Sequence, residues 1–180
     1  MTLLDQRRAL LDDARTAAGE ALAAHAAAEP ALARARRVAI YLAMPTEPPT
    51  QPLIEGFWAR GAAVIVPVVE ADHLLAWVEL EPGVEVRRGA LGIPEPTGPR
   101  LPADALATCD LVVVPALAAD HAGHRLGRGA GYYDRALGAA KAPVCAVVHL
   151  HELLPEVPHE PHDHPVDLVL TPGGLFRVPG

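Results

Sequence analysis

The sequence contains few aromatic residues, few cysteines and no long apolar run, and each shortage excludes some classes of protein. Only 4% of its 180 residues are aromatic although 51% are hydrophobic, so the core has to be built mainly from Val, Leu, Ile and Ala. Helices packed on a sheet suit that mixture. No stretch approaches the ~18 consecutive apolar residues of a membrane-spanning helix. We therefore expect no membrane partner.

The two cysteines, Cys109 and Cys145, lie far apart and form no CxxC pair. Disulfide frameworks and zinc–thiolate sites are therefore disfavoured, and free buried thiols in a reducing compartment are the expected state. The charged residues Asp5, Arg7 and Arg8 interrupt the amino terminus where a signal peptide needs an apolar stretch. These features predict a cytoplasmic protein.

The chain also lacks an excess of basic residues. Its 15 Lys and Arg against 22 Asp and Glu give a formal net charge of −7. That charge repels a polyphosphate backbone, so we expect no nucleic-acid partner. A single anionic small molecule needs only a local basic pocket and is not excluded.

Short apolar runs separated by helical patterns make up most of the chain. Its length suits one domain, and we expect residues 1–180 to form one. Strands alternating with helices predict an α/β fold, with an open, mostly parallel, doubly wound (Rossmann-like) sheet that carries helices on both faces. Pro67 suggests an edge or bulged strand, and the Pro- and Gly-rich residues 81–100 are expected to be a loop. Helices are expected at 3–28, 51–60 and 130–140, and strands at 38–43, 63–69, 74–80, 111–114, 144–148 and 166–170.

The candidate chemistry follows the strand at 111–114, in the segment Gly123–Asp134, which reads GHRLGRGAGYYD. Ligands of open α/β sheets bind beyond the carboxyl ends of the strands, where this segment lies. Three glycines at alternate positions allow the backbone to approach a ligand, and a helix that begins near residue 130 would add its positive end. Arg125 and Arg128 would add charge-assisted contacts to phosphate oxygens. We expect a nucleoside triphosphate to bind here.

A plainer interpretation is that the glycines only shape a turn and that the arginines are solvated. A lone Gly-x-Gly-x-Gly pattern is weak evidence, and the arginines and the strand–loop–helix context favour the phosphate site. The segment is not a Walker A loop, since no Lys-Ser or Lys-Thr follows its last glycine, and it lacks the GxGxxG spacing of a dinucleotide fold. Tyr132 and Tyr133 would equally suit core positions of the following helix.

The segment Gly123–Asp134 closely resembles the signature of the 5-formyltetrahydrofolate cyclo-ligase family, also called 5,10-methenyltetrahydrofolate synthetases. The resemblance extends over most of the chain: Tyr41–Thr50 is similar to the family's strand followed by Glu-x-x-Thr, Gly92–Pro96 to its central loop, and Pro158–Asp167 with Thr171-Pro172 to its carboxyl-terminal stretch. It implies an enzyme that uses ATP and Mg²⁺ to cyclise 5-formyltetrahydrofolate, with or without a polyglutamate tail, to 5,10-methenyltetrahydrofolate, releasing ADP and phosphate. We expect a monomer or a weak homodimer.

The resemblance also implies roles for individual residues. Arg125 and Arg128 would be catalytic, because phosphoryl transfer needs mainly alignment and charge neutralisation. Asp134 and Asp163 would hold magnesium, which prefers carboxylate oxygens. The ATP contacts would be Arg125, Leu126, Gly127, Arg128, Gly129, Ala130, Gly131, Tyr132 and Tyr133. The folate contacts would be Leu42, Glu47, Arg128 and Tyr132. Glu47 would accept hydrogen bonds from the pterin N–H groups, although without the resemblance it would equally be an exposed loop acid.

Two departures from the family pattern leave an alternative open. Members usually carry a Lys and, four residues later, an Arg in the first helix for nucleotide binding, whereas Arg7 and Arg8 are out of that register and would replace the pair only partly. Glu152 stands where many members have Gln. The alternative is a non-catalytic or weakly active folate- or nucleotide-binding relative with a regulatory role. A zinc site at the histidines between 149 and 164 is disfavoured, because three of them lie in a proline-rich stretch that cannot form a helical ligand face.

Overall fold

The computed structural model describes residues 1–180, and its largest element is a seven-stranded sheet. The five inner strands are parallel to one another, whereas the two edge strands are antiparallel to their neighbours. The open, mostly parallel sheet expected from the sequence is therefore confirmed. The strand order is β12 (Gly174–Arg177), β11 (Leu168–Thr171), β9 (Val144–Val147), β6 (Leu111–Pro115), β1 (Arg37–Ile40), β2 (Ala63–Val69) and β3 (Leu75–Glu79).

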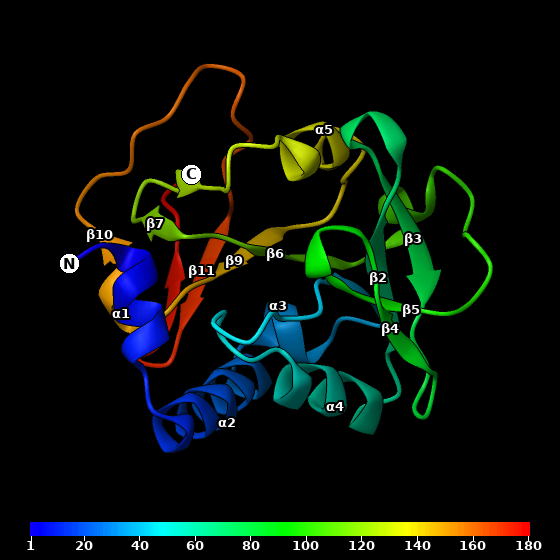
Figure 1. Ribbon diagram of the computed structural model, residues 1–180, viewed down its shortest axis with the longest axis horizontal. Helices are drawn as coiled ribbons and strands as arrows, with labels where there is room; N and C mark the ends of the chain where they lie inside the picture. Colours follow the sequence, from blue (N-terminus) through cyan, green and yellow to red (C-terminus); the bar gives the residue numbers. More distant parts are fainter.

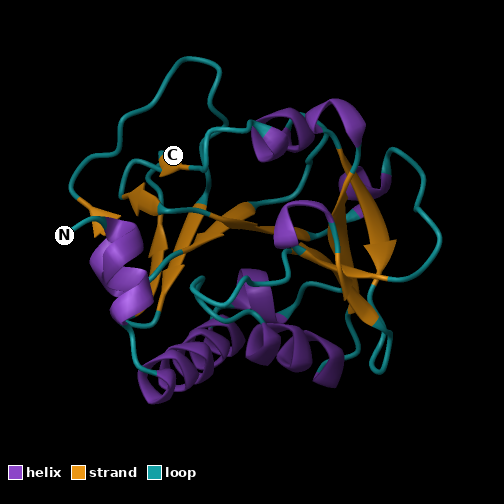
Figure 2. Cartoon of the chain, viewed as in Figure 1, coloured by secondary structure: helices purple, strands orange, loops and turns teal.

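Helices cover both faces of this sheet, as expected (Figure 1, Figure 2). One face carries α2 (Asp12–Ala28), α3 (Pro30–Ala33) and α4 (Gln51–Ala59), and the other carries α5 (Tyr132–Leu137) and the short 3-10 helix η3 (Ala105–Thr108). Successive strand residues point to opposite layers, so that Val38 and Ile40 pack towards α2–α4 while Ala39 packs on the other side. Each fully buried Val, Leu or Ile contributes about 1.5–3 kcal/mol to this aliphatic core.

The prediction of one helix over residues 3–28 is wrong. The chain forms α1 (Leu3–Ala9) and α2, separated by Leu10 and Leu11, whose backbone is extended. A capping box between Thr2 and Asp5 starts α1. The two helices dock on different parts of the molecule: α2 packs on α4, β11 and β12, whereas α1 is fixed through the buried side chain of Arg7. The break allows both contacts to form.

Pro67 lies neither at a sheet edge nor in a bulge, contrary to expectation. β2 is placed between β1 and β3, and its register with β3 runs unbroken from Ile65 to Val69. The parallel register with β1 ends at Ile65. Pro67 therefore lies beyond the pairing with β1, where its missing N–H removes no ladder bond to that strand.

Residues 81–100, expected to be a loop, contain a short hairpin of β4 (Val86–Arg88) and β5 (Pro94–Pro96) joined by the 3-10 turn η2 (Ala90–Gly92). Glu95 anchors this hairpin to the main sheet, because its carboxylate accepts a hydrogen bond from the backbone N–H of Val69 at 2.9 Å. A polar anchor between segments 26 residues apart leaves no periodic signal in the sequence.

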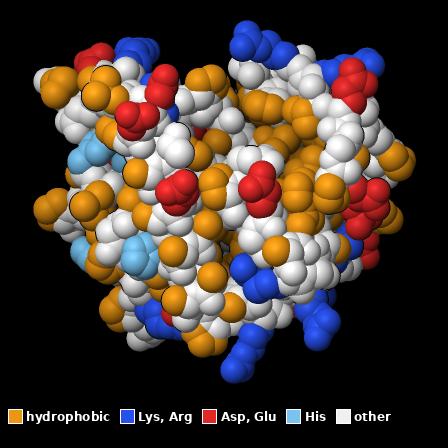
Figure 3. All heavy atoms as spheres, turned by 90° about the horizontal axis from the view of Figure 1, so that it is seen from below, with side chains coloured by type: hydrophobic (Ala, Val, Ile, Leu, Met, Phe, Trp, Pro, Cys, Tyr) orange, Lys and Arg blue, Asp and Glu red, His pale blue; other side chains and the backbone are white.

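The remaining elements are short. A second sheet contains β10 (Leu153–Leu154), β7 (Ala118–Asp120) and β8 (Arg125–Leu126), and two further 3-10 turns are η1 (Ala71–His73) and η4 (Leu150–Glu152). None of the helices combines the length and the apolar character that a bilayer crossing requires. On the face seen in Figure 3, acidic and basic side chains are scattered in small groups, some of them side by side, with apolar side chains between the groups. The negative charge is thus not gathered into one patch on this face.

Candidate active site

The carboxyl ends of β1 and β6 lie at the point where the strand order reverses. The chain runs from β1 to β2 on one side of the sheet, and then continues on the other side through β6, β9 and β11. A cavity of about 500 Å³ opens there, lined by Tyr41 and Leu42 after β1 and by Pro115 and Ala116 at the end of β6. Ligands of open α/β sheets bind at such a reversal, and this volume suits a small molecule.

Apart from Arg8 of the first helix, every residue predicted to bind ATP, folate or magnesium lines this one cavity. Leu42 and Glu47 come from the segment after β1, and Asp163 comes from the loop before β11. The glycine-rich wall supplies the rest, namely Arg125, Leu126, Gly127, Arg128, Gly129, Ala130, Gly131, Tyr132, Tyr133 and Asp134. Residues from three distant parts of the sequence thus share one site.

The glycine-rich wall is a loop rather than the start of a long helix. The helix predicted over residues 130–140 is too long, since α5 begins at Tyr132 and has six residues. Gly129 and Gly131 have φ angles of 84° and 72°, in the left-handed region that a Cβ atom disfavours. Because α5 is so short, we expect the loop backbone, more than a helix dipole, to provide the donors of this wall.

Arg125 is the most deeply placed cation of the wall. It is 8% exposed, and its Nη2 donates a hydrogen bond of 2.5 Å to Oδ1 of Asp134. Its Nε is buried and has no hydrogen-bond partner. A buried N–H without a partner costs about 1–3 kcal/mol, so the cavity wall holds an unused cationic donor. That donor fits an anionic ligand such as a triphosphate.

Asp134 and Asp163 fit a magnesium ion that is completed by ligand oxygens. Oδ1 of Asp134 accepts from Arg125 and from the backbone N–H of His164, which leaves Oδ2 without a hydrogen bond. Asp163 accepts one backbone N–H, from Glu160, at 2.7 Å. No three His, Cys, Asp or Glu side chains gather in a ligand cluster. Magnesium is commonly held by one or two carboxylates together with waters and substrate phosphates, so two aspartates suffice.

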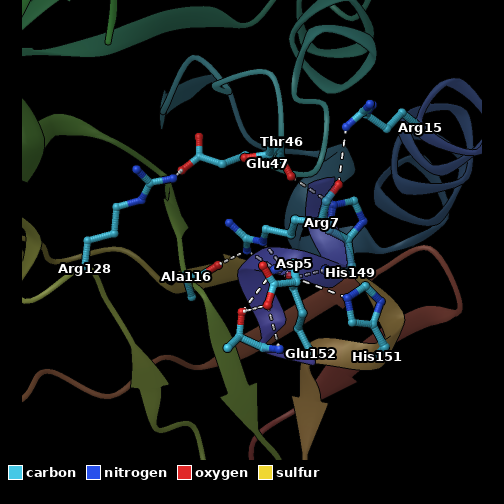
Figure 4. Close-up of polar contacts among 11 residues, drawn as sticks. Asp5, Arg7, Arg15, Thr46, Glu47, Ala116, Arg128, His149, His151 and Glu152 are labelled. Atoms are coloured by element: carbon cyan, nitrogen blue, oxygen red, sulfur yellow. Dashed lines mark hydrogen bonds and ion pairs between the residues drawn. The ribbon is translucent and has the colours of Figure 1, made fainter. Parts of the chain in front are cut away.

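Glu47 is a buried carboxylate, and the alternative that it is an exposed loop acid is wrong. It is 8% exposed, and its Oε2 accepts the backbone N–H of Met44 at 2.8 Å. Its Oε1 lies 3.9 Å from Nη2 of Arg128, which approaches it from the glycine loop (Figure 4). Burial raises the pKa of Glu47, and the Met44 N–H and the Arg128 charge offset this only in part.

The comparison with protein families agrees with this geometry, since the profile of the 5-formyltetrahydrofolate cyclo-ligase family matches residues 1–172. The chain belongs to the 5-formyltetrahydrofolate cyclo-ligase family. It is 44% identical over 144 residues to the 5-formyltetrahydrofolate cyclo-ligase of Mycolicibacterium smegmatis, an alignment that covers 76% of this chain and 74% of that protein. It is 33% identical over 178 residues to that of Escherichia coli K12, covering 96% and 97%.

The fold of this cyclo-ligase family member is similar to a solved structure with a related name. The NMR structure of Aquifex aeolicus 5,10-methenyltetrahydrofolate synthetase superposes with a TM-score of 0.83 at 28% identity, covering 99% of this chain and 90% of that one. The family and the fold class inferred from the sequence are therefore both confirmed.

In this member of the cyclo-ligase family, Arg7 is bound to the protein itself (Figure 4). Its Nε and Nη2 donate to the carboxylate of Glu152 at 2.5 and 2.9 Å, and Nη2 also donates to the carbonyl of Ala116 at 2.6 Å. Arg8 is exposed, pairs with Asp5 at 3.3 Å, and does not line the cavity. Arg7 nevertheless lines the cavity, so a part for Arg7 in replacing the family's Lys–Arg pair at the nucleotide stays a prediction, whereas the position of Arg8 gives it no support.

Sequence reasoning gave no role to several lining residues, although Tyr41 and Ile93 lie in segments that resemble the family pattern. Leu91 and Ile93 of the β4–β5 hairpin reach the cavity, as does Tyr41. The ring of His73 in η1 packs 5.3 Å from the ring of Tyr132. Of these residues, Tyr41 could have been identified from the sequence, because it is the single polar side chain in an otherwise apolar strand segment.

Proposed function

We propose that this protein uses ATP and magnesium to cyclise 5-formyltetrahydrofolate to 5,10-methenyltetrahydrofolate in the cavity between the ends of β1 and β6. The observation that carries the proposal is the union, in one cavity, of a glycine-rich loop bearing Arg125 and Arg128 with the buried carboxylate of Glu47. The loop suits a triphosphate, and the carboxylate suits a heterocycle that presents N–H groups.

On the nucleotide side, Arg125 places a guanidinium in the cavity wall, and Arg128 offers a half-exposed guanidinium. Charge-assisted hydrogen bonds of this kind are roughly twice as strong as neutral ones. The left-handed backbone at Gly129 and Gly131 lets the loop approach the phosphates without Cβ atoms in the way. Asp134 and Asp163 would hold a magnesium ion, which would supply neutralisation of the triphosphate charge.

On the folate side, Glu47 accepts hydrogen bonds from the pterin amino and ring N–H groups, and Leu42 and Tyr132 supply apolar surface. Arg128 lies between the two substrates, since it belongs to the phosphate loop and comes within 3.9 Å of Glu47. Arg128 can therefore contact both the nucleotide and the folate.

The reaction needs no protein nucleophile. The formyl oxygen on N5 bonds to the γ-phosphorus, and the bond from that phosphorus to ADP breaks. N10 then bonds to the formyl carbon and loses its proton, while the carbon–oxygen bond breaks and phosphate leaves. Arg125 and Arg128 contribute by aligning the γ-phosphoryl group with the formyl oxygen and by neutralising its charge.

We further propose a cytoplasmic enzyme that is active as a monomer or weak homodimer. The glycine-rich loop, Glu47 and both aspartates of a single chain already line one cavity, which supports this proposal. Cys109 and Cys145 are buried and free, and burial raises their thiol pKa values to about 11 and about 12, which keeps them protonated and inert.

The test is the near-ultraviolet absorbance of the methenyl product. Purified protein, 5-formyltetrahydrofolate, ATP and magnesium should generate this absorbance, and mixtures lacking either ATP or magnesium should not. The variant Arg125→Ala, shown by circular dichroism to be folded, should give a strongly reduced rate in the same assay. Folded wild-type protein that gives no signal, or a signal that does not depend on ATP, would refute the proposal.

A further inference from the structure

Tyr41 carries a buried hydroxyl group that has no partner in the protein. The residue directly follows β1, is 3% exposed, and lines the cavity. Buried tyrosine hydroxyls normally find a hydrogen-bond partner. Only one other buried side-chain polar atom of the chain lacks one, and that atom is Nε of Arg125, in the wall of the same cavity. Both orphaned atoms therefore belong to side chains that line the cavity.

A phenylalanine would fill the same space at less cost. The Tyr41 side chain packs in the core layer beneath α2 and α4, which needs only its ring. The hydroxyl adds a polar atom that is removed from water and unpaired, which lowers the stability of the ligand-free protein. A ligand that supplies an acceptor would remove this cost.

The backbone around Tyr41 is held in place by Thr50. The hydroxyl of Thr50 donates to the carbonyl of Tyr41 at 2.9 Å and accepts the N–H of Ala43 at 3.1 Å. Glu47 lies within the same turn and also lines the cavity. The turn thus presents a carboxylate and a hydroxyl from one rigid segment.

The hydroxyl acts as a donor because it stays protonated. Burial raises the pKa of Tyr41 well above its ordinary value, and the nearby carboxylate of Glu47 raises it further. The partner of Tyr41 must therefore be an acceptor oxygen or nitrogen.

We propose that Tyr41 is a folate-binding residue whose hydroxyl donates a hydrogen bond to the ring carbonyl oxygen of the pterin, while Glu47 accepts from the neighbouring ring N–H and amino groups. The pyrimidine edge of a pterin presents two donors followed by one acceptor, and a carboxylate beside a hydroxyl is complementary to that order. This assignment rests on the proposed function and extends it to the recognition of the heterocycle.

The test is Tyr41→Phe, which removes one atom and keeps the ring. We expect the Michaelis constant for 5-formyltetrahydrofolate to rise about tenfold, the size of one neutral hydrogen bond, with kcat and the constant for ATP unchanged. Thermal unfolding of the ligand-free variant should occur at the same or a higher temperature. Calorimetry of 5-formyltetrahydrofolate binding without ATP should give the same loss of affinity.

A substrate analogue identifies the contacted atom. With a 5-formyl analogue that has hydrogen in place of the ring carbonyl oxygen, wild type and Tyr41→Phe should have equal affinity. Equal affinity for the natural substrate would overturn the inference, as would a lower unfolding temperature of the variant without a change in folate affinity, which would mean a structural or water-bound hydroxyl. A wild-type protein without turnover would instead refute the proposed function, and the calorimetry would still decide the role of Tyr41.

Discussion

Replacing Arg7 with alanine would remove the buried cation from the carboxylate of Glu152 and leave it with the backbone N–H of His149 and the nearby ring of His151. The side chains of Arg7 and Glu152 are 1% and 0% exposed, and two of the three hydrogen bonds of Arg7 go to this carboxylate. Breaking a buried ion pair from one side costs about 3–5 kcal/mol. For a chain of this length each kcal/mol corresponds to roughly 2–4 °C, so the unfolding temperature should fall by roughly 6–20 °C.

Circular dichroism on heating measures this effect, with Arg8→Ala as the matched control. Arg8 lies on the same helix but is exposed and pairs only with Asp5, so its removal should leave the unfolding temperature nearly unchanged. Replacing both partners, as in Arg7→Met with Glu152→Leu, should restore much of the loss because no charge is left buried. If Arg7→Ala unfolds at the temperature of Arg8→Ala, the buried pair does not hold α1 in place.

Three further predictions concern the cavity. Because burial raises the pKa of Glu47, the folate affinity of the wild type should weaken as the pH falls through that raised value. In Glu47→Gln the folate affinity should depend less on pH, and the same pH dependence in both proteins would contradict this. Asp163→Asn should reduce turnover at limiting magnesium by at least about tenfold without changing the unfolding temperature. Full activity of this variant at limiting magnesium would show that Asp163 does not bind the metal. Gly129→Ala, whose φ of 84° costs an alanine about 1–2 kcal/mol, should weaken ATP binding in calorimetry. Gly61→Ala, which has a similar φ and open space, should cost only stability, and equal ATP affinity in both variants would make Gly129 a simple turn residue.

The sheet was predictable because its strands are short apolar runs bounded by Gly and Pro. The β2 bounds were correct, and the runs at 111–114 and 144–148 differ from β6 and β9 by one residue at one end. The place of the site followed from the same pattern, since the segment after β6 carries both the glycines and Arg125. Local sequence and topology agree there, so the motif and the strand-order reversal give the same position.

The errors arose where tertiary contacts outweigh local preference. Alanine and leucine favour helix on both sides of Leu10, so local preference does not predict the break, which is consistent with the docking of Arg7 against Glu152. The burial of Glu47 and the orphaned hydroxyl of Tyr41 depend on which segments surround the cavity. β12 escaped notice because its residues are only half-buried and show no clear apolar run.

The most direct test of the account follows the formyl oxygen. If the cavity brings the formyl oxygen of the folate against the γ-phosphate of ATP, that oxygen must end in the released phosphate. Turnover of 5-formyltetrahydrofolate labelled with oxygen-18 in the formyl group, followed by mass spectrometry of the phosphate, should show one labelled oxygen per phosphate for each methenyl product formed. Unlabelled phosphate, with the heavy oxygen recovered in water, would contradict the account.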